Sequence, residues 1–404
     1  MGYYRKTLHG LKYQTLMRAS IRIIGFIKVA LIARILGPVE FGIFGIATLL
    51  MGLLDTFTDT GINVFLIQEK NSLKKFLDSA FFVSLTRAVL IALVIVLLNP
   101  FVKQFFNIRS TTQTLLLVAL VSLLRGLINP AMVQFEKKFQ FDKQMTIRVF
   151  LYLLDAIFSI YFCYKFRVSE AIFMGMIVGV FIEILISWFF IKPRAKLKLN
   201  ISQLKYVFTR GKWITLTGIF NYLFHNLDDI FVGRILGVSS LGIYQLSYKL
   251  STVPIYETGE IFGRVTLPVY SKISHSKERL KKAFTKVTFV ISLLVIPLGI
   301  LLIIFAKNIV MIFGNQWLEA VPVVRWLAFF GILRAITGSV TPLFYGIKKQ
   351  EYAMNFILVG LIVLIITIYP LVKIYGIIGA CISTIIATIS TIPIIIFYLK
   401  KEFK

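Results

Sequence analysis

Long apolar runs, separated by short clusters of Lys and Arg, limit what this chain can fold into. A helix that crosses a bilayer needs about 20 predominantly apolar residues. Hydrophobic residues make up 58% of the chain and the mean hydropathy is +0.84, which is more apolar surface than one soluble core of this length can bury. We therefore predict an all-α integral membrane protein with about twelve transmembrane helices. The expected spans are 13–35, 40–66, 78–99, 112–134, 146–165, 169–191, 211–235, 240–268, 287–306, 321–346, 352–372 and 375–399.

A repeated motif divides the chain into two halves. Residues 34–44 and 234–244 share Arg, Ile, Leu, two Gly and Ile at matched positions, 200 residues apart, and each copy places a Gly between two apolar runs. Chance similarity of two loops is the alternative. Further echoes in the same order disfavour it, such as Asp59-Thr60-Gly61 against Glu257-Thr258-Gly259. We predict two pseudo-equivalent six-helix lobes, residues 1–195 and 211–404, joined by a cytoplasmic linker at 196–210.

The distribution of Lys and Arg between loops predicts the orientation in the membrane. One set of alternating loops, including both chain ends, carries 27 basic residues and the other set carries 6. Loops rich in Lys and Arg face the cytoplasm, so both termini are expected there. The 196–210 region has apolar residues at helical spacing among lysines, which fits either a helix on the anionic inner leaflet or a simple orientation signal.

Several function classes are disfavoured by composition. The net charge of +27 is scattered between apolar runs rather than gathered on one recognition face, so we expect no nucleic-acid partner. Cys163 and Cys381 both lie in apolar runs and indicate no disulfide framework. His9, His225 and His275 are far apart and match no zinc-ligand spacing. We expect no metal, no cofactor and no nucleotide-binding loop.

Basic side chains inside the apolar runs point to an anionic cargo, because a charge at membrane depth is costly and should face a partner or water. Arg18 and Arg22 share one face of the first helix, while Lys28 is turned away by nearly a quarter circle. Basic groups outnumber acids in the first half, so pairing within it cannot neutralise all of them. Guanidinium groups bind phosphate oxygens in a forked geometry, which suits a diphosphate. The candidate substrate-binding residues are Arg18, Arg22, Lys28, Arg87, Arg125 and Arg334.

Acidic and histidine side chains in the same runs form a second candidate set, for ion coupling or ion pairing. In apolar surroundings His225, Asp228 and Asp229 could titrate and couple transport to protons or sodium. A structural alternative pairs Arg18 or Arg22 with Asp55 or Asp59, which would only hold the helices in register. Both interpretations are open from the residues alone. The full set is Asp55, Asp59, His225, Asp228, Asp229, Glu257 and Glu260.

The region 11–68 resembles a known family. Its basic first helix, the turn Ala33-Arg34-Ile35-Leu36-Gly37-Pro38-Val39-Glu40-Phe41-Gly42 and the Asp59-Thr60-Gly61 ending are similar to the polysaccharide exporters related to the O-antigen flippases. These belong to the multidrug/oligosaccharidyl-lipid/polysaccharide flippase superfamily. Residues 313–320, ahead of the tenth span, are a further match. The second turn has Val238-Ser239-Ser240 in place of Pro38-Val39-Glu40, so the signature is complete only once.

This resemblance implies a V-shaped pair of six-helix lobes that moves an undecaprenyl-diphosphate-linked oligosaccharide to the outer leaflet without ATP hydrolysis. It also implies that Arg18 and Arg22 face the cavity. We therefore expect a non-enzymatic flippase for O-antigen, lipopolysaccharide or similar polysaccharide units in a bacterial or archaeal cytoplasmic membrane. Its expected partners are lipid-linked oligosaccharide and membrane lipids, and a polysaccharide polymerase and glycosyltransferases are candidate protein partners.

Two other functions compete with this interpretation. A cation-coupled multidrug extrusion antiporter has the same general architecture, but a site for organic cations should be acidic and aromatic rather than basic. A membrane-bound polysaccharide polymerase or glycosyltransferase needs acid, base or metal groups at a loop-formed site, and the outer loops here lack paired carboxylates.

Overall fold

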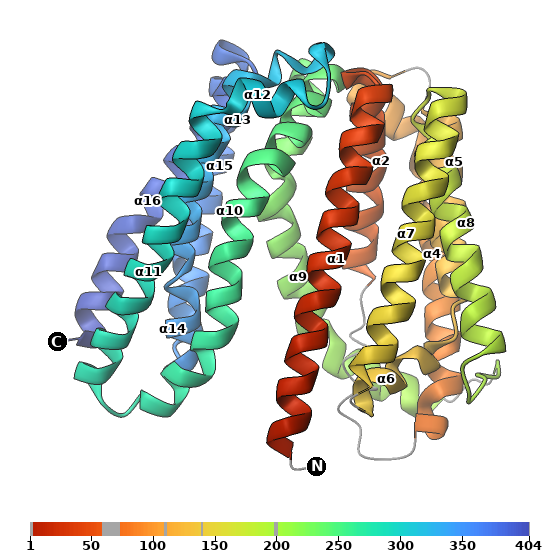
Figure 1. Ribbon diagram of the computed structural model, residues 1–404, viewed down its shortest axis with the longest axis horizontal. Coiled ribbons are helices and arrows are strands. Elements are labelled where there is room, and N and C mark those ends of the chain that lie inside the picture. Colours follow the sequence, from red (N-terminus) through yellow and green to blue (C-terminus); the bar gives the residue numbers. More distant parts are fainter. Residues whose placement is uncertain (1–2, 59–72, 109–110, 139, 198–200, 404) are drawn as a thin grey trace. The chain divides into compact units, whose positions relative to one another are not determined.

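The computed structural model describes residues 3–58, 73–108, 111–138, 140–197 and 201–403, apart from the side chains at 3–11, 73–75, 201–217, 221, 260 and 264. The chain divides into two compact units, Met1–Asn226 and Leu227–Lys404 (Figure 1). All regular secondary structure in this described part is helical, which confirms the expected all-α class.

Six long helices make up most of the first unit. These and the short segments between them are α1 (Tyr3–Ile35), α2 (Pro38–Phe57), α4 (Leu73–Phe106), α5 (Thr112–Gly126), η1 (Pro130–Val133), α6 (Gln134–Lys137), α7 (Phe141–Phe166) and α8 (Glu170–Phe189). A further helix, α9 (Ile201–Leu236), begins in the first unit and ends in the second. Residues 201–210 of the expected linker are therefore helical.

The second unit continues with long helices and short connecting turns of helix. They are α10 (Val238–Ile273), α11 (Lys277–Ile304), α12 (Ala306–Met311), η2 (Asn315–Trp317), α13 (Ala320–Gly338), α14 (Thr341–Gly346), α15 (Gln350–Tyr375) and α16 (Ile377–Phe403). Each expected span that the structure describes coincides with one of these helices or with a broken pair of them.

Eight helices in the described residues are long and apolar enough to cross a membrane, or nine if one bent pair counts as a single span. The long helices α1, α9 and α10 fall outside that set because charged and polar side chains are spread along them. The membrane-protein class agrees with the prediction, and the count of about twelve spans stays a prediction.

The bent pair interrupts the run expected at 112–134, which is not one straight helix. The bend is 66° between Thr112–Gly126 and Pro130–Lys137. Pro130 has no backbone N–H to continue the helix. The Asn129 side chain then caps the new segment, because its Oδ1 accepts a hydrogen bond from the Ala131 amide at 3.1 Å. Its Nδ2 donates to the carbonyl oxygens of Ser187 and Pro193, so the break is fixed to the end of α8.

Close helix contacts in the first unit depend on small residues. A Cβ added to Gly175 on α8 would lie 2.3 Å from the backbone nitrogen of Ser159 on α7, so only glycine fits there. The Ser159 hydroxyl donates to the carbonyl oxygen of Ile172 across the same contact at 3.2 Å. Small residues let helices approach closely where lipid provides no hydrophobic driving force between them. This contact holds α7 against α8.

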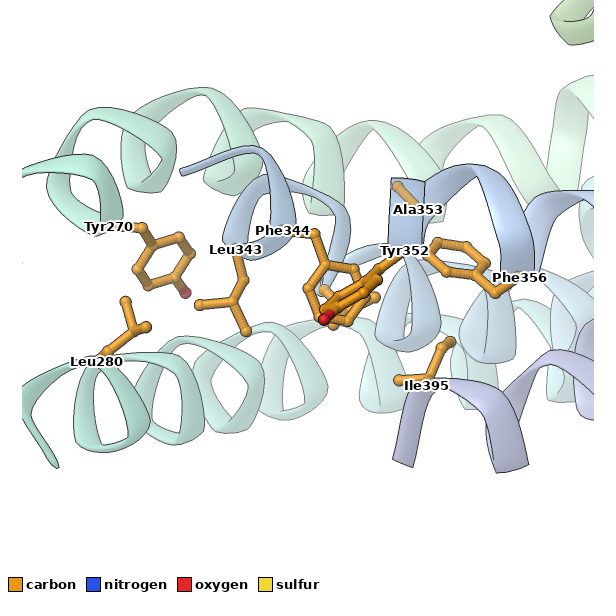
Figure 2. Close-up of a cluster of buried hydrophobic side chains, with 9 residues drawn as sticks. Tyr270, Leu280, Leu343, Phe344, Tyr352, Ala353, Phe356 and Ile395 are labelled. Atoms are coloured by element: carbon orange, nitrogen blue, oxygen red, sulfur yellow. The ribbon is translucent and has the colours of Figure 1, made fainter. Parts of the chain in front are cut away.

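An aromatic cluster closes one end of the second unit (Figure 2). The rings of Tyr352 on α15 and Tyr398 on α16 are stacked with centroids 4.0 Å apart, and Phe344 of α14 meets Tyr352 edge-on at 5.5 Å. Lys349 and Lys401 each place an ammonium within 6 Å of the Tyr352 ring centroid, at 5.8 and 5.7 Å. Stacked aromatic rings and cation–π contacts with two lysines thus join α14, α15 and α16 near their ends.

The two copies of the repeated turn differ in backbone conformation. Gly37, the N-cap of α2, has φ −78° and ψ 174°, an extended conformation that any residue adopts before a proline. Gly237, the N-cap of α10, has φ 86° and ψ −179°, which an L side chain adopts only with strain. An added Cβ would meet nothing within 4 Å at either position, so the two sites differ only in the backbone.

We expect Gly237→Ala to destabilise the protein by about 1–3 kcal/mol, since the extended positive-φ region is nearly restricted to glycine. Gly37→Ala is the matched control and should be neutral or stabilising by about 0.4–1 kcal/mol, through a less flexible unfolded chain. Thermal unfolding of both purified variants in one detergent measures the difference. Equal shifts of the two midpoints would contradict this assignment of the backbone.

Candidate functional site

A buried ion pair joins α1 to α7 in the first unit. Lys28 Nζ lies 2.7 Å from Asp155 Oδ2, and the two side chains are 11% and 18% exposed. The Ser159 hydroxyl shares its single proton between the Ile172 carbonyl oxygen and the other carboxylate oxygen of Asp155, which lies 3.3 Å away. The turn of Lys28 away from Arg18 and Arg22, read from helical spacing, explains why Lys28 faces α7. Lys28 therefore has a carboxylate partner within the protein, although the sequence analysis grouped it with the substrate-binding residues.

A second cluster joins α2 to α4. Arg87 Nη2 donates to the backbone carbonyl oxygen of Asp55 at 2.7 Å and to its carboxylate Oδ1 at 3.0 Å. Arg87 Nε donates to the Thr58 hydroxyl at 2.8 Å. The guanidinium thus binds the last turn of α2, whose C-terminal carbonyls favour a cation. Arg87 is a partner of Asp55 that the sequence analysis did not identify.

Other expected cations of the first unit are on exposed surfaces. Arg18 and Arg22 are exposed on α1, and Arg125 is exposed in the last turn of α5. The third ion pair in this part of the structure, Arg148 with Glu183 at 3.4 Å, involves a side chain that is 49% exposed.

The charges of these spans do not balance. Three carboxylates have the cationic partners Lys28, Arg87 and Arg148, and the fourth, Asp59, lies outside the described residues. Within their predicted bounds the spans of the first half contain eight basic groups and seven carboxylates, and without the two residues at each span end they contain six and four. The excess of basic over acidic groups away from the span ends is the electrostatic feature that an anionic ligand could neutralise.

In the second unit a buried carboxylate lies between α9 and α10. Asp228 is 5% exposed, and its Oδ2 accepts a hydrogen bond from the Tyr244 hydroxyl at 2.6 Å. Its Oδ1 accepts the backbone amide of Asp229 at 3.1 Å. Among the described residues, Asp229 Oδ1 is buried without a hydrogen-bond partner. Two adjacent carboxylates, one of them incompletely satisfied, form a site that can take up a proton or a cation.

Arg334 of α13 is held by aromatic side chains of α10. Its Nη1 donates to the Tyr248 hydroxyl at 2.6 Å, and its guanidinium carbon lies 4.7 Å from the Tyr256 ring centroid. A further ring, that of Phe330, is 5.7 Å away. The pattern of apolar runs did not point to Tyr244 and Tyr248. The sequence feature that could have indicated them is their four-residue spacing on one helix, close to two intramembrane aspartates.

The remaining expected residues are less informative. His225 is exposed at the end of the first unit, with its ring 5.4 Å from that of Phe224. Glu257 is half-buried on α10, and the side chain of Glu260 is not among those described. The structure thus brings together Asp228 with Asp229, and Arg87 with Asp55, but does not describe one site that contains every expected residue.

Solved structures with this architecture are transport proteins. The chain matches the lipid II flippase MurJ in an inward closed conformation with a TM-score of 0.78 and 16% identity, over 96% of this chain and 88% of that chain. It matches an inward-facing multidrug resistance MATE family transporter of the MOP superfamily with a TM-score of 0.69 and 14% identity, over 96% and 98%. At such identities the likeness shows the fold. The molecule has the fold of these transport proteins.

Sequence comparison then identifies the family. Residues 31–322 match the family described as polysaccharide biosynthesis protein, and the chain belongs to this family. It is 28% identical over 409 residues to a membrane protein of the cps region of Klebsiella pneumoniae, covering 99% of this chain and 84% of the relative. It is 25% identical to the lipopolysaccharide biosynthesis protein WzxC of Escherichia coli K12, covering 88% and 73%. The teichuronic acid biosynthesis protein TuaB of Bacillus subtilis is 22% identical, covering 83% and 71%. The family resemblance seen in the first turn is confirmed.

We expect Lys28→Met to destabilise the protein by about 3–5 kcal/mol, because it leaves the Asp155 carboxylate buried without its cation. The double variant Lys28→Met with Asp155→Leu should recover most of this loss, since both charges are then removed. Arg148→Met is the control for a longer pair whose cation is 49% exposed, and it should cost less than Lys28→Met. Thermal unfolding of the wild type, Lys28→Met, Asp155→Leu and the double variant completes the cycle, and strictly additive single effects would show that the two side chains do not interact.

Proposed function

We propose that this protein is a flippase that moves undecaprenyl-diphosphate-linked oligosaccharide repeat units across the cytoplasmic membrane by alternating access. Membership of the polysaccharide biosynthesis family supports the sugar substrate. A lipid-linked form of this sugar substrate is supported by two observations. Two relatives are named as lipopolysaccharide and teichuronic acid biosynthesis proteins, and the fold is shared with a lipid II flippase. In this proposal both termini face the cytoplasm, as the loop charges predict.

The observation that carries the proposal is the positive surplus in the spans of the first half. A diphosphate that crosses a membrane must exchange its hydration for protein donors, and arginine offers a planar set of donors that matches phosphate oxygens. Arg18 and Arg22 are exposed on one face of α1, four residues apart, so one diphosphate can bind both. We assign the diphosphate contact to this pair, with Arg125 as an additional cation.

The other basic residues have different roles in this proposal. Lys28 and Arg87 neutralise Asp155 and Asp55 and so hold α1 and α4 in position. Arg334 remains a candidate contact for a phosphate or sugar, because its guanidinium is presented by the Tyr248 hydroxyl and the Tyr256 ring. A polysaccharide polymerase and glycosyltransferases are the proposed partners on either side of the transport step.

Ion coupling is assigned to the second unit. Asp228 and Asp229 lie next to each other at membrane depth, and a charged pair there would be costly without a bound proton or cation. His225, Glu257, Glu260, Asp55 and Asp59 complete the set of candidate coupling or pairing groups. Uptake of a proton or sodium ion by the aspartates would then bias the transporter toward one state.

We expect the double substitution of Arg18→Gln with Arg22→Gln to reduce surface polysaccharide by at least tenfold, as two charge-assisted contacts of about 1.5–3 kcal/mol each are lost. Lys281→Gln with Lys282→Gln removes the same charge from exposed positions of α11 and should leave export unchanged. Surface polymer and membrane-inserted protein are both quantified in a host whose only copy of the gene carries the change. Normal polymer from the α1 variant would refute the proposed diphosphate contact.

Asp228→Asn should abolish the response of transport to an imposed ion gradient, since the amide keeps an acceptor for Tyr244 but cannot lose or gain the charge. The measurement is lipid-linked oligosaccharide flipping in proteoliposomes with and without a proton or sodium gradient. Asp142→Asn, at the start of α7, is the control and should respond as the wild type does. A gradient response that persists in Asp228→Asn would assign coupling to other residues.

A further inference from the structure

The contacts between α1 and α7 determine which residues of the two helices lie opposite each other. The helices run side by side in Figure 1, drawn in red and yellow. Gln14 Nε2 donates to Gln144 Oε1 at 3.0 Å, and Lys28 Nζ lies 2.7 Å from Asp155 Oδ2 further along the same contact. The sequence separations of these pairs are 130 and 127, so the two helices are parallel. Tyr152 of α7 therefore faces the part of α1 that lies between the two pairs.

A glycine on α1 makes room for the Tyr152 hydroxyl. A Cβ built on Gly25 would lie 2.9 Å from the hydroxyl oxygen and 3.6 Å from the nearest ring carbon. The oxygen, rather than the ring, therefore occupies the space above Gly25. Arg18, Arg22 and Gly25 share one face of α1, so the hydroxyl lies in line with the two arginines. Three hydrogen-bond donors thus follow one another along about 10 Å of this face, at about 1.5 Å of rise per residue.

The Tyr152 hydroxyl makes no hydrogen bond within the described residues, although its side chain is half-buried. Its charged neighbours are Asp155 and Arg22. The Asp155 carboxylate is already bound by Lys28 at 2.7 Å. Most polar groups in the interior of a protein have a hydrogen-bond partner, so a phenol without one requires an explanation. Next to a cation, this hydroxyl is a donor that a ligand with anionic oxygens can use.

We infer that Tyr152 makes the site on α1 selective for a diphosphate over a monophosphate, by donating a hydrogen bond to the second phosphate. This inference rests on the proposed diphosphate contact of Arg18 and Arg22. Side chains four residues apart on a helix can converge on one phosphate, whereas the hydroxyl lies about one turn further along the same face. A monophosphate held by the arginines leaves the hydroxyl unused, and a diphosphate engages all three donors. The neutral phenol adds a directional donor without adding positive charge.

The test compares undecaprenyl diphosphate with undecaprenyl phosphate as probes for the purified full-length protein. Native mass spectrometry of titrations in one detergent gives the dissociation constant of each lipid, and the wild type should prefer the diphosphate. Tyr152→Phe should reduce this preference about tenfold, the effect of one hydrogen bond to a charged group, and leave the affinity for the monophosphate unchanged. Tyr161→Phe removes an exposed phenol of the same helix and is the matched control, which should bind both lipids as the wild type does.

Variants at Gly25 separate the role of the hydroxyl from the packing of α1 on α7. Gly25→Ala keeps the phenol but displaces its oxygen, so this variant should also lose the preference for the diphosphate. Combining Gly25→Ala with Tyr152→Phe removes the overlap, because the nearest remaining ring carbon lies at an ordinary contact distance of 3.6 Å. The double variant should unfold at or above the wild-type temperature and still lack the preference. Recovery of the preference in the double variant would show that only packing is involved and would overturn the inference.

Failure of this inference can be told apart from failure of the proposed function. An unchanged preference in Tyr152→Phe, together with weak binding of both lipids by the double variant Arg18→Gln with Arg22→Gln, would overturn the role of Tyr152 alone. Wild-type affinity for both lipids in the arginine variant would instead refute the diphosphate contact on α1, and the inference with it. Equal affinity of the wild-type protein for the two lipids would also overturn the proposed selectivity.

Discussion

The ion pair between Lys28 and Asp155 lets the charged first helix lie in a bilayer and sets its rotation there. A lone ammonium at that depth is costly, and a carboxylate 127 residues away in sequence removes the cost by binding it at 2.7 Å. Once α1 is fixed against α7 in this way, its rotation is set. Arg18, Arg22 and Arg34 are then exposed, whereas Lys28 is buried. One buried contact therefore assigns two different surroundings to the basic residues of a single helix.

The second unit manages its charges differently. Its buried carboxylate, Asp228, accepts a hydrogen bond from the Tyr244 hydroxyl, and Arg334 donates one to the Tyr248 hydroxyl. Neutral phenols thus orient both charged groups. Lys28 and Asp228 occupy equivalent positions 200 residues apart, and their opposite charges show how far the two copies have diverged chemically.

The sequence predicts much of the fold because apolar periodicity depends only on local residues. Most helix ends agree with the expected spans within a few positions, and the Gly between apolar runs marks both repeated turns. It does not predict the partner of Lys28, because no spacing rule connects positions on α1 and α7. The bend at Asn129 was also missed, since it depends on hydrogen bonds to the carbonyls of Ser187 and Pro193. The tyrosines around Arg334 are brought there by packing between helices, which composition does not record.

The different backbones at Gly37 and Gly237 have a consequence for how such a repeat can change. The first turn has an ordinary extended conformation, so its position accepts any residue that fits before a proline. The second turn is confined to glycine by its positive φ. The two copies of the motif thus differ in tolerance to substitution, although both carry glycine at this position.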